Sequence, residues 1–205
     1  MSSPTYGEGA IGVLGSAFNP PHLGHLALAQ EAAWQLGLAE VILVPAGQAP
    51  HKRIADDPGK GARMEMTRLA AADDDRFSVS ALEVEREGPS YTYETLEALA
   101  EERGDRELVF VMGADAAVGL ESWRNPGRVV ELASLAVARR AGVSDADVGE
   151  AMRSLGCEGR ATMLEMPQFG VSSSVVRERA KLGRPLRYLV PDAVADFIAE
   201  RGIYR

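Results

Sequence analysis

Short apolar blocks alternate along this chain with segments whose apolar residues recur every three or four positions. The blocks are rich in Val, Ile and Leu and lie near residues 10–15, 41–45, 77–84, 107–112, 134–139 and 161–166. The helical patterns cover about 24–36, 61–73, 93–103, 126–132, 145–155, 173–182 and 192–201. Buried strands that alternate with helices are typical of a parallel sheet covered on both faces. We therefore predict an α/β fold: a single domain with a doubly wound, mostly parallel sheet and right-handed crossovers.

Several helix ends carry signals of their own. Ser and Thr side chains accept from free N–H groups at a helix start, glycine commonly follows the last turn, and proline suits the first turn. These signals predict N-caps at Thr92 and Ser144, ends before Gly37, Gly104 and Gly156, and a start led by Pro191.

Composition narrows the class of protein. A chain of 205 residues can bury about 70% of its unfolded surface, and its single cysteine, Cys157, excludes an internal disulfide. We expect a cytoplasmic protein, because the N-terminal residues lack a signal-peptide pattern and no apolar run reaches the length of a membrane span. The 22 Lys and Arg residues against 30 Asp and Glu residues give a net charge of −8. We therefore predict no nucleic-acid and no membrane partner, and any bound anion must be held by a few local cations.

The most informative stretch is Gly15-Ser-Ala-Phe-Asn-Pro-Pro-His-Leu-Gly-His25, where a predicted strand meets a predicted helix. Free backbone N–H groups and the positive end of the helix dipole favour an anion there by about 0.3–1 kcal/mol for each exposed charge. His22 and His25 are three residues apart, so they face the same way and add donors. This turn is predicted to hold a nucleotide phosphate.

A zinc site is the alternative for these histidines. Together with His51 they supply three nitrogen ligands. A helical pair, however, needs its third ligand at a fixed place and a supporting partner, and Gly24 suits close approach of a ligand to the backbone. We prefer the phosphate and predict no metal held by the protein itself.

Two common nucleotide-binding patterns are excluded. Gly7-Glu-Gly-Ala-Ile-Gly12 has the letters of the dinucleotide fingerprint but precedes the first strand instead of following it. The phosphate-loop pattern fails because Gly61, not a hydroxyl residue, follows Lys60. Neither NAD-dependent hydride transfer nor kinase-like phosphate transfer is supported.

Two further segments fit a phosphate-binding edge. Residues 45–61 form a long loop at a strand's carboxyl end, where such sheets bind ligands, and loops of this length are often lids. Val171-Ser-Ser-Ser-Val-Val-Arg177 gathers three hydroxyls at another helix start, with Arg177 one turn further on to clamp phosphate oxygens.

Taken together, these motifs resemble the nucleotidyltransferases with an H-x-G-H motif and, within them, the bacterial nicotinate-nucleotide adenylyltransferases. The likeness runs nearly end to end. It includes Gly15 to His25, Pro50-His-Lys52, Pro89-Ser-Tyr-Thr92, Gly113-Ala-Asp115, Trp123, Arg139-Arg140, the serine-rich turn and Gly202-Ile-Tyr-Arg205.

The resemblance implies a role for each matching residue. It makes His22, His25, Lys52 and Arg177 catalytic, the histidines on the ATP phosphates and Lys52 on the mononucleotide phosphate. ATP contacts are implied for Gly15, Ser16, Phe18, Gly113, Asp115, Ser172, Ser173 and Ser174, with Asp115 on a ribose. Substrate contacts are implied for Tyr91 and Thr92 (pyridine carboxylate), Trp123 (ring stacking) and Arg140 (phosphate). The helices of about 172–205 would complete the ATP site of one domain, 1–205.

The chain also departs from the family pattern. The family usually has Gly-Gly-Thr-Phe-Asp, whereas this chain has Leu14-Gly-Ser-Ala-Phe-Asn19, which keeps a hydroxyl one place earlier and removes a charge at Asn19. Val171, Ser174 and Ala141 replace the usual Ile, Thr and Pro. These changes leave phosphate chemistry in place but loosen the inference about which pyridine nucleotide is preferred.

The implied reaction is adenylyl transfer from ATP to nicotinate mononucleotide, giving the dinucleotide and pyrophosphate, with Mg²⁺ on the ATP phosphates. The implied partners are therefore ATP and a pyridine mononucleotide; a homo-oligomer and regulation stay open. One alternative is the same reaction on the amide form, and another is a catalytically silent nucleotide-binding module. Transfer to phosphopantetheine or a sugar phosphate is disfavoured by Trp123 and the Tyr91-Thr92 segment.

Overall fold

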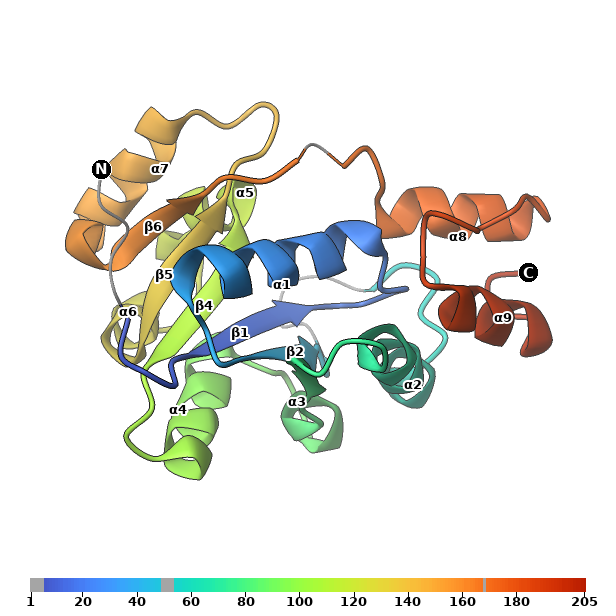
Figure 1. Cartoon of the computed structure of the whole chain (residues 1–205), viewed down its shortest axis with the longest axis horizontal. Helices are drawn as coiled ribbons and strands as arrows, with labels where there is room; N and C mark the ends of the chain where they lie inside the picture. The colour runs from blue at the N-terminus through green and yellow to red at the C-terminus, as the bar shows by residue number, and fades with distance from the viewer. Residues whose placement is uncertain (1–5, 49–53, 168) are drawn as a thin grey trace. The chain divides into compact units, whose positions relative to one another are not determined.

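The computed structural model describes residues 6–48, 54–167 and 169–205. Figure 1 shows strands that alternate with helices along the chain. The strands are β1 (Ile11–Ser16), β2 (Glu40–Pro45), β3 (Phe77–Val79), β4 (Leu108–Gly113), β5 (Ala133–Ala138) and β6 (Ala161–Leu164). The α-helices are α1 (Leu23–Leu36), α2 (Lys60–Ala71), α3 (Leu82–Glu85), α4 (Thr92–Arg103), α5 (Ala114–Val118), α6 (Pro126–Leu132), α7 (Asp145–Ser154), α8 (Ser173–Lys181) and α9 (Asp192–Glu200). Two 3-10 turns are η1 (Leu120–Ser122) and η2 (Glu158–Arg160).

The strands form one parallel sheet in the order β3-β2-β1-β4-β5-β6. The chain builds outward from β1 to β3, returns to place β4 against the other side of β1, and then builds outward again. β1 pairs with β4 so that Ile11 lies opposite Leu108 and Leu14 opposite Val111. This is the strand order of a doubly wound sheet, so the predicted fold class is confirmed.

The prediction of a strand over 77–84 is wrong in its second half. The strand β3 stops at Val79, and Ser80 donates its N–H to the Leu43 carbonyl at 3.0 Å. Ala81 then adopts a helical conformation and α3 begins at Leu82. The other predicted strands and helices lie within two residues of the observed ones.

Helix capping agrees with the sequence at one N-cap and differs at two others. The Ser144 hydroxyl accepts from Asp147 N–H at 3.1 Å, and the Asp147 carboxylate accepts from Ser144 N–H at 3.0 Å, which is a full capping box. Thr92 is instead the first helical residue, and Tyr91, with extended backbone, is the N-cap. Pro191 likewise sits at the N-cap position of α9 and not inside its first turn. Gly104 ends α4 with φ 65°, a conformation that glycine adopts without steric cost.

The backbone divides into two compact units. The first comprises Met1–Gly15, Leu28–Ile42 and Tyr91–Gln168, and the second comprises Ser16–Ala27, Leu43–Ser90 and Phe169–Arg205. In the first unit β5 is buried at all of its positions, as expected for a strand covered on both faces, and α4 packs on α6 and α5 on α7.

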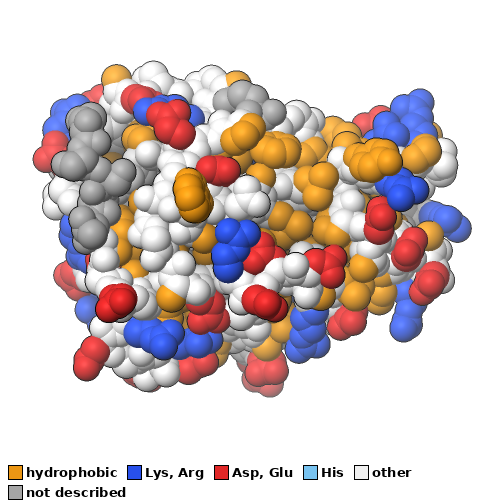
Figure 2. Space-filling view, viewed as in Figure 1, with side chains coloured by type: hydrophobic (Ala, Val, Ile, Leu, Met, Phe, Trp, Pro, Cys, Tyr) orange, Lys and Arg blue, Asp and Glu red, His pale blue; other side chains and the backbone are white. Residues whose placement is uncertain are grey.

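The core of the second unit joins three helices. Met66 of α2, Val176 of α8 and Val194 and Ile198 of α9 share one buried cluster. Because α8 begins at the serine-rich turn, this cluster fixes where that turn lies. The face shown in Figure 2 intersperses acidic and basic side chains, which suits a chain whose net charge is −8. Among the helices of the described ranges none is long and apolar enough to cross a membrane.

Candidate active site

The histidine turn lies between β1 and α1 in the second unit and is held by its own side chains. The His22 N–H donates to Nδ1 of His25 at 3.2 Å. The hydrogen of a neutral His25 ring is therefore assigned to Nε2, which lies 3.2 Å from Ser16 Oγ. The two imidazoles lie with their centroids 3.8 Å apart and their planes tilted by 31°. Ser16, His22 and His25 thus form one linked group.

Phe18 and Gly24 shape this turn in ways that their predicted roles do not include. The Phe18 side chain is fully buried, and its ring lies edge-on to that of His25 with centroids 4.9 Å apart. A Cβ on Gly24 would come within 3.1 Å of the His22 ring. The glycine between the two histidines therefore allows the His22 imidazole to fold back over the helix start.

The serine-rich turn uses its three hydroxyls differently. Ser172 is the N-cap of α8, and its hydroxyl accepts from Val175 N–H at 3.3 Å. Ser173 donates to the Pro20 carbonyl at 2.9 Å. Ser174 is exposed and accepts from Nη2 of Arg177 at 3.2 Å. Ser172 and Ser173 stabilise the turn, and Ser174 is the hydroxyl that faces solvent beside the guanidinium.

The two turns meet in the second unit, as the sequence predicts. The Ser173 hydroxyl bonds to the Pro20 carbonyl, and Nη1 of Arg177 donates to the Asn19 carbonyl at 2.8 Å. The residues joined in this way are 153 and 158 positions apart in the chain. Two helix N-termini, two imidazoles and a guanidinium therefore belong to one bonded group, which is the arrangement that a polyanionic ligand requires.

Arg177 also faces a carboxylate that the sequence did not indicate. Its Nε lies 3.5 Å from Oδ2 of Asp56, and Lys181 Nζ lies 2.9 Å from Oδ1 of the same residue. The hydrogen bond and the charge of Lys181, with smaller contributions from Arg177, lower the pKa of Asp56 below its ordinary value. An internal anion therefore already lies against the cation that was predicted to clamp phosphate.

Asn19 and Tyr204 form a buried pair beside the histidine turn. The Tyr204 hydroxyl donates to Oδ1 of Asn19 at 2.6 Å, and Nδ2 of Asn19 donates to the Ala55 carbonyl at 2.7 Å. Burial raises the pKa of Tyr204 well above its ordinary value. Sequence reasoning noted both residues, one as a departure from the family pattern and one in the closing motif, but assigned neither a role.

In the first unit, two predicted site residues pair with each other. Nη1 of Arg140 lies 3.1 Å from Oδ2 of Asp115, and both side chains are more than half exposed. A Cβ on Gly113, the last residue of β4, would lie 2.7 Å from Oδ1 of Asp115, so glycine allows the carboxylate to fold back over the strand end. Arg139, by contrast, pairs with Asp145 and Glu165.

The aromatic residues predicted for the pyridine ring lie in the same unit. Trp123 is partly exposed and meets Phe110 edge-on, with ring centroids 6.2 Å apart. Tyr91 lies beneath the Arg124 guanidinium at 6.0 Å and stacks on Tyr93. Thr92 begins α4. The N–H groups of Glu94 and Thr95 donate to the Tyr91 carbonyl at 3.1 and 3.2 Å, whereas those of Thr92 and Tyr93 have no acceptor within the helix.

The predictions for Lys52 and for His51 lie outside the described residues. Within the ranges that the structure describes, no group of three or more His, Cys, Asp or Glu side chains could hold a metal ion. Cys157 is buried, and burial raises the pKa of its thiol.

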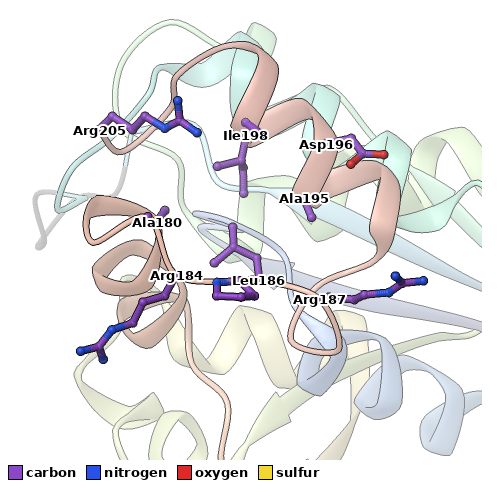
Figure 3. A pocket seen from close by; sticks show the side chains of 11 residues that line it. Ala180, Arg184, Leu186, Arg187, Ala195, Asp196, Ile198 and Arg205 are labelled. Carbon is purple, nitrogen blue, oxygen red and sulfur yellow. The ribbon is translucent and has the colours of Figure 1, made fainter.

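A cavity of about 300 Å³ lies between α8 and α9, away from the predicted residues (Figure 3). Leu186 and Ile198 face its interior, while the Arg184 guanidinium points away from it. None of the predicted site residues lines this cavity.

The chain is similar to known proteins over nearly its whole length. The family model described as cytidylyltransferase-like matches residues 13–179. A relative from Synechococcus sp. strain JA-3-3Ab, described as a probable nicotinate-nucleotide adenylyltransferase, is 39% identical over 100% of this chain and 99% of its own length. This chain belongs to the nicotinate-nucleotide adenylyltransferase family. A second member of that family, from Roseiflexus sp. strain RS-1, is 40% identical over 95% of this chain and 98% of its own length.

Solved structures of one other protein resemble this chain in their fold. Nicotinic acid mononucleotide adenylyltransferase from Plasmodium falciparum, complexed with APC, superposes with a TM-score of 0.76 over 96% of this chain and 98% of its own. The two sequences are 14% identical, so this match concerns the fold alone. The same Plasmodium protein complexed with NaAD gives a TM-score of 0.75. This Plasmodium protein and this chain therefore share one fold.

Proposed function

We propose that this protein transfers the adenylyl group of ATP to nicotinate mononucleotide. A phosphate oxygen of the mononucleotide attacks the α-phosphorus of ATP, a new P–O bond forms, and the bond to the β-phosphate oxygen breaks to release pyrophosphate. The products are nicotinate adenine dinucleotide and pyrophosphate. No protein nucleophile takes part, because the attacking phosphate is already ionised at neutral pH.

The joining of the two turns in the second unit carries this proposal. Arg177 and Ser173 each bond to the backbone of the histidine turn. Donors from both turns are therefore fixed before a ligand arrives, and preorganised donors need no rearrangement as charge develops on the transferring group. Two anions must be aligned and their charge stabilised, which is most of the work of phosphoryl-type transfer.

The roles in the second unit follow from exposure and donor type. His25 and His22 stabilise charge on the α-phosphate, and Arg177 with Ser174 holds the other end of the triphosphate. Ser16 acts through its contact with Nε2 of His25, while Gly15 and Phe18 line the ATP site through their backbones. Ser172 and Ser173 hold the serine-rich turn in place. In this proposal the C-terminal segment of 172–205 completes the ATP site within one domain of 1–205.

In the first unit, the proposed roles concern the sugars and the mononucleotide. Asp115 accepts from ribose hydroxyls over Gly113, and Arg140 grips the mononucleotide phosphate together with Lys52. Trp123 stacks on the pyridine ring. Backbone N–H groups at Tyr91 and Thr92 bind its carboxylate.

The residues present suit a magnesium ion carried by the substrate. The described side chains around the two turns are mainly cations, imidazoles and hydroxyls, and their nearby carboxylate, Asp56, is paired with Lys181. This donor set fits Mg²⁺ bound through ATP phosphates and water. When bound, the ion neutralises charge on the phosphates. A cytoplasmic location accords with this use of soluble nucleotides.

Pyrophosphate release tests the proposal. The purified protein with ATP, Mg²⁺ and nicotinate mononucleotide should release pyrophosphate, and His22→Ala should lower kcat by about 10²–10³-fold, as expected for loss of one preorganised donor. The variant should still bind an ATP analogue. A catalytically silent binding module would release no pyrophosphate before or after the substitution.

The acid and amide substrates are separated by kinetics. An amide reader needs a hydrogen-bond acceptor, whereas free N–H groups at the start of α4 suit a carboxylate. We expect kcat/KM to be higher for nicotinate mononucleotide than for nicotinamide mononucleotide. The reverse order would assign the protein to the amide reaction.

A further inference from the structure

Arg63 is a fully buried arginine on α2, a helix without a predicted part in the site. Its exposed fraction is 0%, and Met64 and Met66 on the same helix are also buried. A buried guanidinium is unfavourable unless all of its donors are bonded and its charge is paired. The hydrogen-bond partners of the Arg63 guanidinium therefore show which segments it holds together.

Each of its nitrogens has a partner, and the partners belong to three different segments. Nε lies 2.9 Å from the Asp57 carboxylate. Nη1 donates to the Ala17 carbonyl at 3.0 Å and to the Ala46 carbonyl at 2.6 Å, and Nη2 donates to the Gly47 carbonyl at 3.2 Å. Arg63 thus bonds to the histidine turn, to the residues that follow β2, and to the segment that precedes α2.

The Ala17 carbonyl that Arg63 binds is connected to the His25 imidazole through one neighbouring residue. Ala17 follows Ser16, whose hydroxyl lies 3.2 Å from Nε2 of His25. The Ser16 carbonyl in turn accepts from Ala46 N–H at 2.8 Å. The end of β1 is therefore joined to the residues after β2 both directly and through Arg63. Moving the Ala17 carbonyl would move Ser16 and, with it, the contact of its hydroxyl with His25.

We propose that Arg63 is a positioning residue for adenylyl transfer, which sets the histidine turn by fixing the Ala17 carbonyl against Ala46, Gly47 and Asp57. This inference rests on the proposed function for the reaction that Arg63 would serve, whereas the hydrogen bonds of Arg63 do not depend on that function. A planar guanidinium donates in several directions from one rigid group, and no other side chain of similar size does so. Lysine at this position could bond to only some of the four acceptors.

The test compares Arg63→Lys and Arg63→Met with Arg68→Met. Arg68 lies on the same helix, is mostly exposed, and its side chain lies 3.8 Å from Glu65. All three proteins are assayed well below their unfolding temperatures. We expect both Arg63 variants to lose about tenfold or more in kcat with a smaller change in KM for ATP, and Arg68→Met to keep both constants.

A second readout does not require turnover. The chain contains three histidines, so imidazole nitrogen NMR can follow each ring. Arg63→Lys should change the Nε2 signal of His25, because its contact with Ser16 is altered, and Arg68→Met should not. If both Arg63 variants leave the His25 signal and kcat unchanged while only lowering thermal stability, Arg63 is structural and the proposal fails. If the unaltered protein releases no pyrophosphate, the proposed function fails, and the His25 signal alone decides on Arg63.

Discussion

Asp56 alters the surroundings that the sequence predicted for Arg177. Arg177 was expected to be open for phosphate, but its Nε faces the Asp56 carboxylate, which Lys181 also holds. Neighbouring contacts keep this carboxylate in place, because Asn19 bonds to Ala55 and Arg63 to Asp57. The fold therefore already places a negative charge near the proposed triphosphate.

The first prediction concerns this charge. Asp56→Asn should lower KM for ATP about two- to fivefold, because it removes a like charge from beside the incoming phosphates at an exposed position. Steady-state kinetics at fixed ionic strength measures the effect. Asp75→Asn makes the same change in net charge at an exposed residue and should leave KM unchanged. A higher KM in Asp56→Asn would show that the carboxylate orients Arg177 instead of competing with ATP.

Tyr204 leads to a prediction about alkaline stability. Burial raises its pKa above the ordinary value of 10, so the unfolded chain loses this proton first as the pH rises. The stabilisation is complete below pH 10 and is lost as the pH rises above it. Denaturant unfolding from pH 8 to 11 should show this loss, and Tyr204→Phe should reduce its steepness.

The same substitution should also lower stability at neutral pH. It leaves the buried Oδ1 of Asn19 without its donor, which costs about 1–3 kcal/mol. Tyr188→Phe is the control, because Tyr188 is 79% exposed and should change neither quantity. Equal alkaline slopes for Tyr204→Phe and the unaltered protein would contradict the assigned cause of the pKa shift.

At the scale of elements, local signals located the helices but not all of their caps. Ser144 is an N-cap as predicted, and Asp147 completes a capping box that the sequence analysis did not predict, whereas Tyr91 takes the N-cap position predicted for Thr92. The strand over 77–84 failed because its second half is decided by a distant contact. Glu83 is buried and its carboxylate accepts from Gly47 N–H at 3.3 Å, which an apolar pattern along the chain does not record.

The capping box of α7 gives the next prediction. Ser144→Ala removes the acceptor for Asp147 N–H and should lower the free energy of unfolding by about 0.5–2 kcal/mol. Urea denaturation measures the loss. Because α7 carries no proposed site residue, kcat and KM should stay as they were. An unchanged free energy of unfolding would mean that water replaces the cap without cost.

At the scale of the whole molecule, the residues named from the resemblance belong to local motifs, whereas those found only in the structure make contacts between distant parts of the chain. The sequence predicted the sheet and the joining of the two turns, because both follow from motifs at strand and helix ends. It did not predict Arg63 or the pairing of Asn19 with Tyr204. Arg63 reaches Ala17 across 46 positions and Tyr204 reaches Asn19 across 185, and neither has a local pattern.

Hydrogen exchange offers a prediction at this scale. A non-hydrolysable ATP analogue should slow amide exchange first in residues 16–25 and 172–177, because the two helix starts in these segments are proposed to bind phosphates. Mass spectrometry of peptides with and without the analogue measures this. The peptide that covers α7 serves as the internal reference. Protection confined to the cavity between α8 and α9 would place the nucleotide elsewhere and contradict the proposed site.

The ion pair of Asp115 and Arg140 has a consequence for selectivity. Both side chains are exposed, so the pair contributes only about 0–1 kcal/mol and a ligand can separate it. Free inorganic phosphate would engage the arginine and strand the carboxylate, and a nucleoside without phosphate would do the opposite. In the proposed function Asp115 binds a ribose of ATP and Arg140 binds the mononucleotide phosphate, so both partners are compensated only when the two substrates are bound together. Because separating the pair costs at most about 1 kcal/mol, it would favour joint binding of the two substrates by no more than about fivefold.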